Sequence, residues 1–256
     1  MGTLDGQVAV ITGAGRGIGQ AIALALAAEG ATIVVSSRTE SELAATLDAA
    51  GGSSGGTLVV ADAMDRDDAR RPVDIAVERF GRIDILVNNV GGNTGGDADP
   101  FGGNLAAFEQ TVLLSLTSAW WSTSAALPAM REQGSGRVIS IGSGASKRSG
   151  ASVGYTAAKH GLVGMTKEIA RAGAPHGINA NLLCPGWTDT SLVDFERIAE
   201  RRGTTPDAER DRAEAESLQQ RILDPSELTA MAVLLAGPGG AGVTGQVISV
   251  DGGYKV

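Results

Sequence analysis

Short apolar runs that alternate with longer helical stretches are the feature that most constrains the fold of this chain. The runs are rich in Val, Ile and Leu, and most of them are apolar on both faces. They cover residues 8–11, 32–35, 58–60, 83–87, 137–141, 178–183 and 246–250. Strands of a parallel sheet have this pattern, because helices cover both faces of such a sheet.

The intervals between the runs have the length and patterning of helices. They include residues 18–29, 40–50, 66–80, 105–130 and 155–172. Strand and helix that alternate in this way predict βαβ units with right-handed crossovers. We therefore expect an α/β fold, namely a doubly wound, roughly seven-stranded parallel sheet with helices on both faces. The 256 residues contain no linker or repeat, so we expect one domain over residues 1–256.

Composition excludes several classes of protein. No apolar run reaches the ~18 residues that a membrane span needs. Residues 1–6 have neither a basic leader nor an apolar segment, so we expect no secretory signal and a cytoplasmic location. One cysteine and two histidines leave no set of ligands for a metal cluster. The net charge of −8 argues against a nucleic-acid partner.

A glycine-rich turn directly follows the first apolar run and leads into a predicted helix. Glycine permits a tight turn there, and it lets a phosphate approach backbone N–H groups at the positive end of the helix. The turn lacks the Gly-Lys-Ser/Thr ending of a P-loop, which disfavours a nucleotide hydrolase. The residues expected to hold a dinucleotide here are Gly13, Gly15, Arg16, Gly17, Ile18 and Gly19.

The spacing Thr-Gly-x3-Gly-x-Gly resembles the turn of the short-chain dehydrogenase/reductase family, and the resemblance extends over nearly the whole chain. Three later segments resemble the family's cofactor contacts, one after the third run, one after the fourth and one after the sixth. The sequences are Ala61-Asp62-Ala63, Asn88-Asn89-Val90-Gly91 and Pro185-Gly186-Trp187-Thr188-Asp189-Thr190. The resemblance therefore implies that the cofactor is also bound by Asp62, Ala63, Asn89, Gly91, Pro185, Gly186, Thr188 and Thr190.

The end of the second run indicates which nicotinamide dinucleotide is bound. An NAD-binding protein of this kind would place a carboxylate near Ser37, where it would bond the adenosine ribose hydroxyls. This chain instead has Ser37 followed by Arg38, and Arg16 lies in the glycine turn. A small polar residue beside arginines suits the 2′-phosphate of NADP. We therefore expect NADP(H), with NAD(H) as the alternative if both arginines are ordinary surface cations.

Tyr155 and Lys159 lie four residues apart, and so on one face of a predicted helix. Ser143 ends the preceding run, so strand, loop and helix should bring hydroxyl, phenol and ammonium together at the carboxyl edge of the sheet. The three match the Ser-Tyr-Lys set of the family. The match implies that Tyr155 is the general acid/base and that Ser143 orients the substrate oxygen. Lys159 should hold the nicotinamide ribose and, with the nicotinamide cation, lower the pKa of the tyrosine.

One position departs from the family. Its members often have an asparagine in the long helix after the fourth strand, where it supports a water-mediated proton relay through the lysine. Ser115 stands at that position in this chain. A serine offers one site fewer than an amide for hydrogen bonds. We therefore count Ser115 among the catalytic residues and expect it to fill this role less completely.

Two segments without strand-like patterning should border the substrate. Residues 91–103 are rich in Gly, Asp and Asn and predict a flexible loop at the carboxyl end of a strand. Residues 191–221 interleave Arg with Asp and Glu, which predicts solvated helices that form a lid over the pocket. We expect residues 92–103, 143–153 and 187–221 to form the substrate pocket.

These features predict an oxidoreductase that transfers a hydride between NADP(H) and a small-molecule ketone or secondary alcohol. The family resemblance implies a homotetramer. One alternative is an NAD-dependent dehydrogenase that oxidises a cyclic alcohol or a diol, which requires Arg16 and Arg38 to be bystanders. The other is a non-catalytic cofactor-binding protein on the same fold, which only Ser115 favours.

Overall fold

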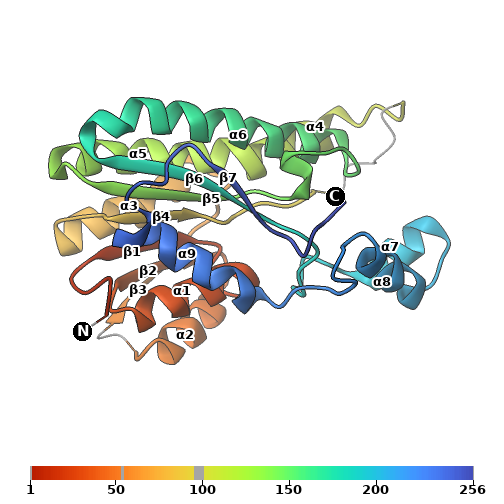
Figure 1. The fold of residues 1–256 in the computed structure, drawn as a ribbon, viewed down its shortest axis with the longest axis horizontal. Helices are drawn as coiled ribbons and strands as arrows, with labels where there is room; N and C mark the ends of the chain where they lie inside the picture. The colour runs from red at the N-terminus through yellow and green to blue at the C-terminus, as the bar shows by residue number, and fades with distance from the viewer. Residues whose placement is uncertain (1, 53–54, 95–100, 256) are drawn as a thin grey trace.

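The computed structural model describes residues 2–52, 55–94 and 101–255. Within them, seven strands form one sheet in the order β3-β2-β1-β4-β5-β6-β7, and each neighbouring pair is parallel (Figure 1). The strands are β1 (Val8–Thr12), β2 (Thr32–Ser37), β3 (Gly56–Val60), β4 (Ile85–Asn88), β5 (Gly136–Ile141), β6 (Ile178–Pro185) and β7 (Val247–Val250). The strand order reverses between β1 and β4, and a sheet of this kind binds ligands in the crevice at that point.

Helices cover both faces of the sheet, as the sequence predicted. They are α1 (Gly17–Ala28), α2 (Glu40–Ala49), α3 (Arg66–Phe80), α4 (Leu105–Val112), α5 (Ser118–Gln133), α6 (Val153–Gly173), α7 (Phe195–Arg202), α8 (Pro206–Ala215) and α9 (Thr229–Ala236). In Figure 1, α4, α5 and α6 lie above the sheet, and α1, α2 and α9 lie below it. None of the described helices is long and apolar enough to cross a membrane.

Two apolar cores flank the sheet, because successive residues of a strand point to opposite faces. Ile11 of β1 packs in a cluster with Ile22 of α1. Its neighbour Val10 packs in a second cluster with Met130 of α5. This two-sided burial is the reason that the strands read as continuous apolar runs in the sequence.

The helix predicted over residues 105–130 is interrupted by one π-helical turn. The turn spans Leu113–Thr117 and joins α4 to α5, which continues to Gln133. A π turn inserts an extra residue into a helix and is frequent at functional sites. Ser115 lies in this turn and is fully buried. The sequence pattern gave no sign of the turn, because the apolar spacing on either side of it remains helical.

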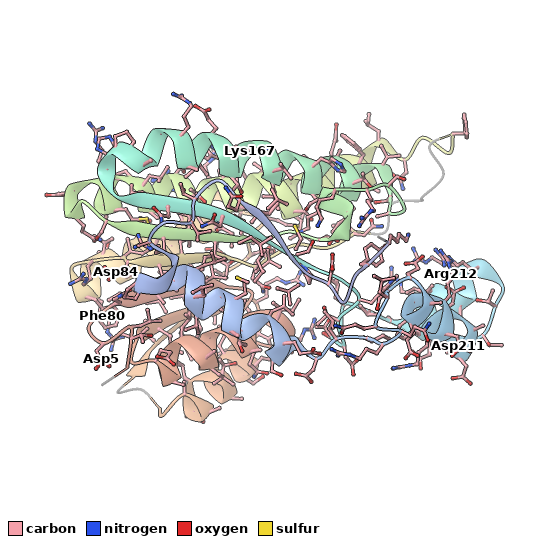
Figure 2. All side chains as sticks on the ribbon, viewed as in Figure 1. Asp5, Phe80, Asp84, Lys167, Asp211 and Arg212 are labelled. Atoms are coloured by element: carbon pink, nitrogen blue, oxygen red, sulfur yellow. The ribbon has the colours of Figure 1, made fainter. Side chains whose placement is uncertain are left out.

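The charged segment at residues 191–221 forms α7 and α8, which extend beyond the carboxyl ends of the strands (Figure 1). Asp211 and Arg212 lie on α8, well away from the sheet (Figure 2). Of the loop predicted at residues 91–103, residues 95–100 lie outside the described part of the chain.

Candidate active site

The glycine turn between β1 and α1 is folded tightly against the end of β4. Gly13 has a φ of 64° and Gly17 a φ of 57°, which favour glycine. A Cβ at Gly19 would lie only 2.3 Å from the carbonyl oxygen of Gly13. Asn89 closes the turn from the side, since its Nδ2 donates to the carbonyls of Thr12 and Gly13. Asn89 therefore shapes the turn rather than facing outward.

The N-terminus of α1 is open to an anion. Among the described residues no side chain caps it, although Arg16 occupies the N-cap position. The first N–H groups of a helix have no partner within it, so these groups are available to a phosphate. The side chain of Ile18, by contrast, packs against the apolar core and anchors the first turn.

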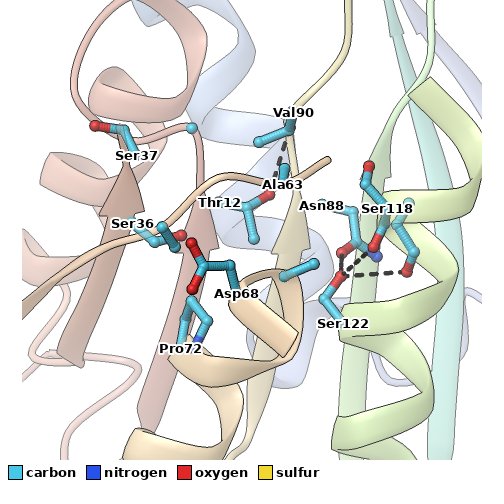
Figure 3. Close-up of a pocket in the computed structure, with 14 residues that line it drawn as sticks. Thr12, Ser36, Ser37, Ala63, Asp68, Pro72, Asn88, Val90, Ser118 and Ser122 are labelled. Carbon is cyan, nitrogen blue, oxygen red and sulfur yellow. Dashed lines mark hydrogen bonds between the residues drawn. The ribbon is translucent and has the colours of Figure 1, made fainter. Parts of the chain in front are cut away.

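A pocket lies beside this turn, between the carboxyl ends of β2, β3 and β4. Ser37, Ala63, Asp68 and Val90 are among the residues that line it (Figure 3). Asp62 is exposed next to the pocket, and its carboxylate accepts the N–H of Met64. Asp68 of α3 accepts the N–H of Asp62 and fixes the strand end. Sequence reasoning missed Asp68, since an acidic residue in the first turn of a helix is read as a helix-end preference.

The end of β2 carries the residues expected to select the dinucleotide. Ser37 Oγ accepts the N–H of Thr39 at 3.3 Å. The Arg38 side chain is exposed and has no ion pair within the described residues. Arg16 is paired, with Nη1 3.4 Å from Oε1 of Glu42. The two arginines therefore differ. Arg38 is free to bind an anion, whereas Arg16 already pairs with the carboxylate of Glu42.

The structure brings Ser143, Tyr155 and Lys159 together. Ser143 directly follows β5, while Tyr155 and Lys159 lie one turn apart on α6. The side chain of Ser143 lies close enough to that of Tyr155 to act on the pKa of the phenol. Lys159 Nζ lies 5.5 Å from the centre of the Tyr155 ring and donates to the carbonyl of Ile141 at 2.7 Å. Three groups capable of handling a proton thus share one edge of the sheet.

Burial decides the proton affinities in this cluster. It raises the pKa of Tyr155 above its usual value, although the side chain of Ser143 acts in the opposite direction. Burial also lowers the pKa of Lys159 to about 8. The lowered tyrosine pKa that we expect belongs to the cofactor-bound site, where Lys159 and the nicotinamide cation act together. In the structure the ammonium of Lys159 bonds the Ile141 carbonyl rather than the phenol oxygen. The desolvation of the phenolate then outweighs the attraction.

Ser115 lies next to this cluster through two glycines. Its Oγ accepts the N–H of Gly92 and donates to the carbonyl of the same residue, both at 3.0 Å. A Cβ at Gly91 would lie 3.0 Å from Lys159 Nζ and 3.6 Å from Ser115 Oγ. Ser115, the residue that departs from the family pattern, is therefore close to Lys159. Its hydroxyl both accepts and donates a hydrogen bond.

The turn after β6 reaches across the crevice. Gly186 sits against the backbone of Asp251, where a Cβ would lie 2.7 Å from the carbonyl oxygen. Thr188 is buried and donates to the Gly186 carbonyl. The methyl group of Thr190 would lie 3.1 Å from a Cβ at Gly17. Thr190 thus faces the glycine turn, whereas Thr188 bonds within the turn after β6. Pro185, which ends β6, is buried.

The C-terminal tail forms a wall beside Ser143, which sequence reasoning missed. The Tyr254 ring packs on Gly144, where a Cβ would lie 2.3 Å from Cε1. Lys255 pairs with Glu216 at 3.2 Å, and Glu216 also accepts the indole N–H of Trp187 at 2.8 Å. The tail therefore ties the end of α8 to the turn after β6. No local sequence signal indicates contacts over such separations.

A parallel sheet with this strand order, a glycine turn at its switch point and a Ser-Tyr-Lys cluster at its carboxyl edge together define a dinucleotide-dependent oxidoreductase. A family model described as enoyl-(acyl carrier protein) reductase matches residues 13–255. The chain belongs to the short-chain dehydrogenase/reductase family. Its members act on alcohol or ketone groups with NAD(P)(H), so this chain is an oxidoreductase of that kind.

Relatives match along almost the whole chain. An uncharacterized oxidoreductase, YxjF of Bacillus subtilis, is 37% identical over 97% of this chain and 98% of its own. The D-beta-hydroxybutyrate dehydrogenase of Cupriavidus necator is 35% identical over 98% of each chain.

Solved structures agree with this fold. Levodione reductase superposes with a TM-score of 0.90 at 31% identity, over 98% of both chains. A protein from Beutenbergia cavernae with bound NADP at low occupancy has a TM-score of 0.87 at 33% identity, covering 98% of this chain and 97% of its own.

Proposed function

We propose that the protein is an NADP(H)-dependent ketoreductase that interconverts a small ketone and its secondary alcohol. The observation that carries the proposal is the cluster of Ser143, Tyr155 and Lys159 beside the open N-terminus of α1. Ser143 holds the substrate oxygen. Tyr155 donates its proton to that oxygen during reduction and takes a proton from the alcohol during oxidation.

The residues of the crevice fit a dinucleotide. The uncapped N–H groups of α1 suit the diphosphate, and the pocket lined by Ser37, Ala63 and Asp68 suits the adenosine. Lys159 and Thr190 hold the nicotinamide half, Lys159 through the ribose hydroxyls. A bound nicotinamide supplies or accepts the hydride.

The protonation states suit carbonyl reduction at neutral pH. Burial raises the pKa of Tyr155, so its phenol carries the proton that reduction consumes. Lys159 remains an ammonium below about pH 8, and this cation favours the phenolate that remains after transfer. Ser115 supports the lysine by fixing the Gly91–Gly92 backbone against it.

The preference for NADP(H) rests on Arg38, whose guanidinium is exposed beside Ser37. A free arginine forms strong, often bidentate bonds with a phosphate. The NADP bound to the Beutenbergia cavernae protein, which is 33% identical to this chain, supports the same assignment. Assembly into a homotetramer, a single domain over residues 1–256 and a lid at residues 191–221 remain part of the proposal.

A titration of the protein with NADPH and NADH, followed by nicotinamide fluorescence, tests the cofactor. We expect NADPH to bind at least about tenfold more tightly, which is about 1.4 kcal/mol. Arg38→Ala should reduce that ratio about tenfold, whereas Arg70→Ala, which removes an exposed cation of α3, should leave it unchanged. Tighter NADH binding would overturn the NADP(H) assignment. NADPH oxidation with a panel of ketones then tests the reaction, and failure to turn over any ketone would favour the non-catalytic alternative.

One observation favours a second candidate function. The carboxylate of Glu42 borders the same space beside Gly15 as the hydroxyl of Ser37, and the Cupriavidus necator relative is a D-beta-hydroxybutyrate dehydrogenase. An NAD-dependent dehydrogenase that oxidises a small hydroxyl compound would use such a carboxylate in place of one at the end of β2. The same titration separates the two functions.

A further inference from the structure

The carboxylate of Glu42 borders the space between the glycine turn and the end of β2. A Cβ at Gly15 would lie 2.9 Å from Glu42 Oε2 and 3.1 Å from Ser37 Oγ. Both oxygens therefore face the same small volume. The other carboxylate oxygen of Glu42 lies 3.4 Å from Nη1 of Arg16. One side chain thus touches both the pocket edge and one of its two arginines.

The fold holds Glu42 in this place. Thr46, one turn further along the same face of α2, is fully buried and donates to the carbonyl of Ala14 at 3.0 Å. Gln20 of α1 in turn donates to the hydroxyl of Thr46 at 3.1 Å. These bonds dock α2 on the glycine turn. Because residues i and i+4 share a helix face, the docking of Thr46 aims Glu42 at Gly15.

The charges in this corner oppose each other. A 2′-phosphate next to Ser37 would lie near two arginines and one carboxylate. Arg38 has no ion pair among the described residues, whereas Arg16 is already paired with Glu42. A carboxylate repels a phosphate and competes with it for Arg16, whereas it does neither to the uncharged hydroxyl of NAD(H). The Glu42 side chain is one-third exposed, so solvent screens this effect without removing it.

We propose that Glu42 is a specificity-determining residue that weakens binding of the adenosine 2′-phosphate and so limits the preference for NADP(H). The inference rests on the proposed function, because it assumes that the crevice binds a nicotinamide dinucleotide. Glu42 reaches Arg16 and the space next to Ser37 from another element, 26 residues beyond Arg16 in the chain.

Glu42→Gln tests the proposal, with binding measured by fluorescence titration of NADPH and NADH and by calorimetry with adenosine 2′,5′-bisphosphate and 5′-AMP. The control is Glu40→Gln, which removes an exposed carboxylate from the same first turn of α2. We expect Glu42→Gln to tighten NADPH and the bisphosphate about fivefold, the scale of an exposed charge pair, with NADH and 5′-AMP within about twofold. The control should change none of the four constants by more than about twofold.

Two outcomes would overturn the proposal. An unchanged NADPH constant in Glu42→Gln would show that the carboxylate does not act on the phosphate. A weaker NADH constant with NADPH unchanged would show that Glu42 instead binds a ribose hydroxyl. Thermal unfolding of both variants checks that the partly exposed substitution leaves the fold intact.

Substitution of Arg16 provides a second, independent test of the proposal. If the ion pair with Glu42 keeps Arg16 from the phosphate, Arg16→Gln should weaken NADPH binding only slightly in the wild-type background. In the Glu42→Gln background the same substitution should weaken NADPH binding about fivefold more. Equal losses in the two backgrounds would contradict the competition. The proposed function is tested separately. If the wild type prefers NADH, the NADP(H) assignment fails, but tighter NADPH binding by Glu42→Gln would still support the role of Glu42.

Discussion

Ser115 and Gly92 exchange two hydrogen bonds through a single hydroxyl, since Ser115 Oγ accepts the N–H of Gly92 and donates to its carbonyl, at 3.0 Å each. The serine is fully buried in the π turn between α4 and α5. It therefore satisfies both backbone groups of a residue next to Gly91, which touches Lys159. The hydroxyl of Ser115 is therefore engaged with the backbone of Gly92, one residue from the glycine beside the lysine.

Ser115→Ala should destabilise the protein and slow the reaction. The substitution leaves the buried N–H and carbonyl of Gly92 without a partner among the described residues, which costs about 1–3 kcal/mol. Chemical unfolding measures that loss, and we expect the rate of ketone reduction to fall about tenfold as Lys159 loses its fixed neighbour. Ser124→Ala is the matched control, because the hydroxyl of Ser124 donates to the Trp121 carbonyl within its own helix. Equal effects of the two substitutions would remove the special role of Ser115.

The stability of the wild type should rise with pH relative to Lys159→Met. Burial lowers the pKa of Lys159 from 10.5 to about 8. Between these values the unfolded chain binds more protons than the folded one, so folding becomes more favourable as pH increases. Below about pH 8 the lysine is charged in both states, and the full cost of burying the ammonium remains.

Urea unfolding at several pH values measures the difference. At about 1.4 kcal/mol per pKa unit, the wild type should gain at most about 3 kcal/mol over the variant by pH 10.5. Lys167→Met removes an exposed lysine of α6 and should follow the wild-type profile (Figure 2). A constant difference between wild type and Lys159→Met over this range would contradict the lowered pKa.

Tyr155→Phe should abolish most of the activity without affecting the cofactor. The phenylalanine keeps the ring but has no proton to exchange, and loss of a general acid typically costs about 10²–10⁴ in rate. We expect the NADPH dissociation constant to stay within about threefold. Tyr254→Phe changes the other tyrosine in the same way and should retain most of the rate. Near wild-type turnover by Tyr155→Phe would disprove its assignment.

Gly144→Ala should disturb the tail that packs beside Ser143. The new methyl group would lie 2.3 Å from the Tyr254 ring, so the tail must move. We expect kcat/KM for the ketone to fall about tenfold while NADPH binding is retained. Gly164→Ala is the control, since that glycine is exposed on α6 with nothing within 4 Å. This alanine should stabilise the helix by about 0.5–1 kcal/mol. An unchanged kcat/KM in Gly144→Ala would show that the tail does not border the substrate.

Local pattern predicted the sheet and the glycine turn, and together with the family resemblance it predicted the cluster of Ser143, Tyr155 and Lys159. Short apolar runs that alternate with helical stretches favour strands of a parallel sheet, and the carboxyl ends of such strands meet at one edge. Residues that follow them, or that lie one helical turn apart, are therefore brought together by the topology. The sequence also identified Ser115 as the position that departs from the family.

Only the tertiary structure decided which side chains meet across elements. Glu42 reaches Gly15 because Thr46 docks α2 on the glycine turn, and Tyr254 covers Gly144 because the tail folds back over more than a hundred residues of chain. The raised pKa of Tyr155 likewise depends on its burial among other elements. Spacing along a chain carries the period of a helix or strand, but not the packing angle between two elements, and it is that angle that sets these contacts.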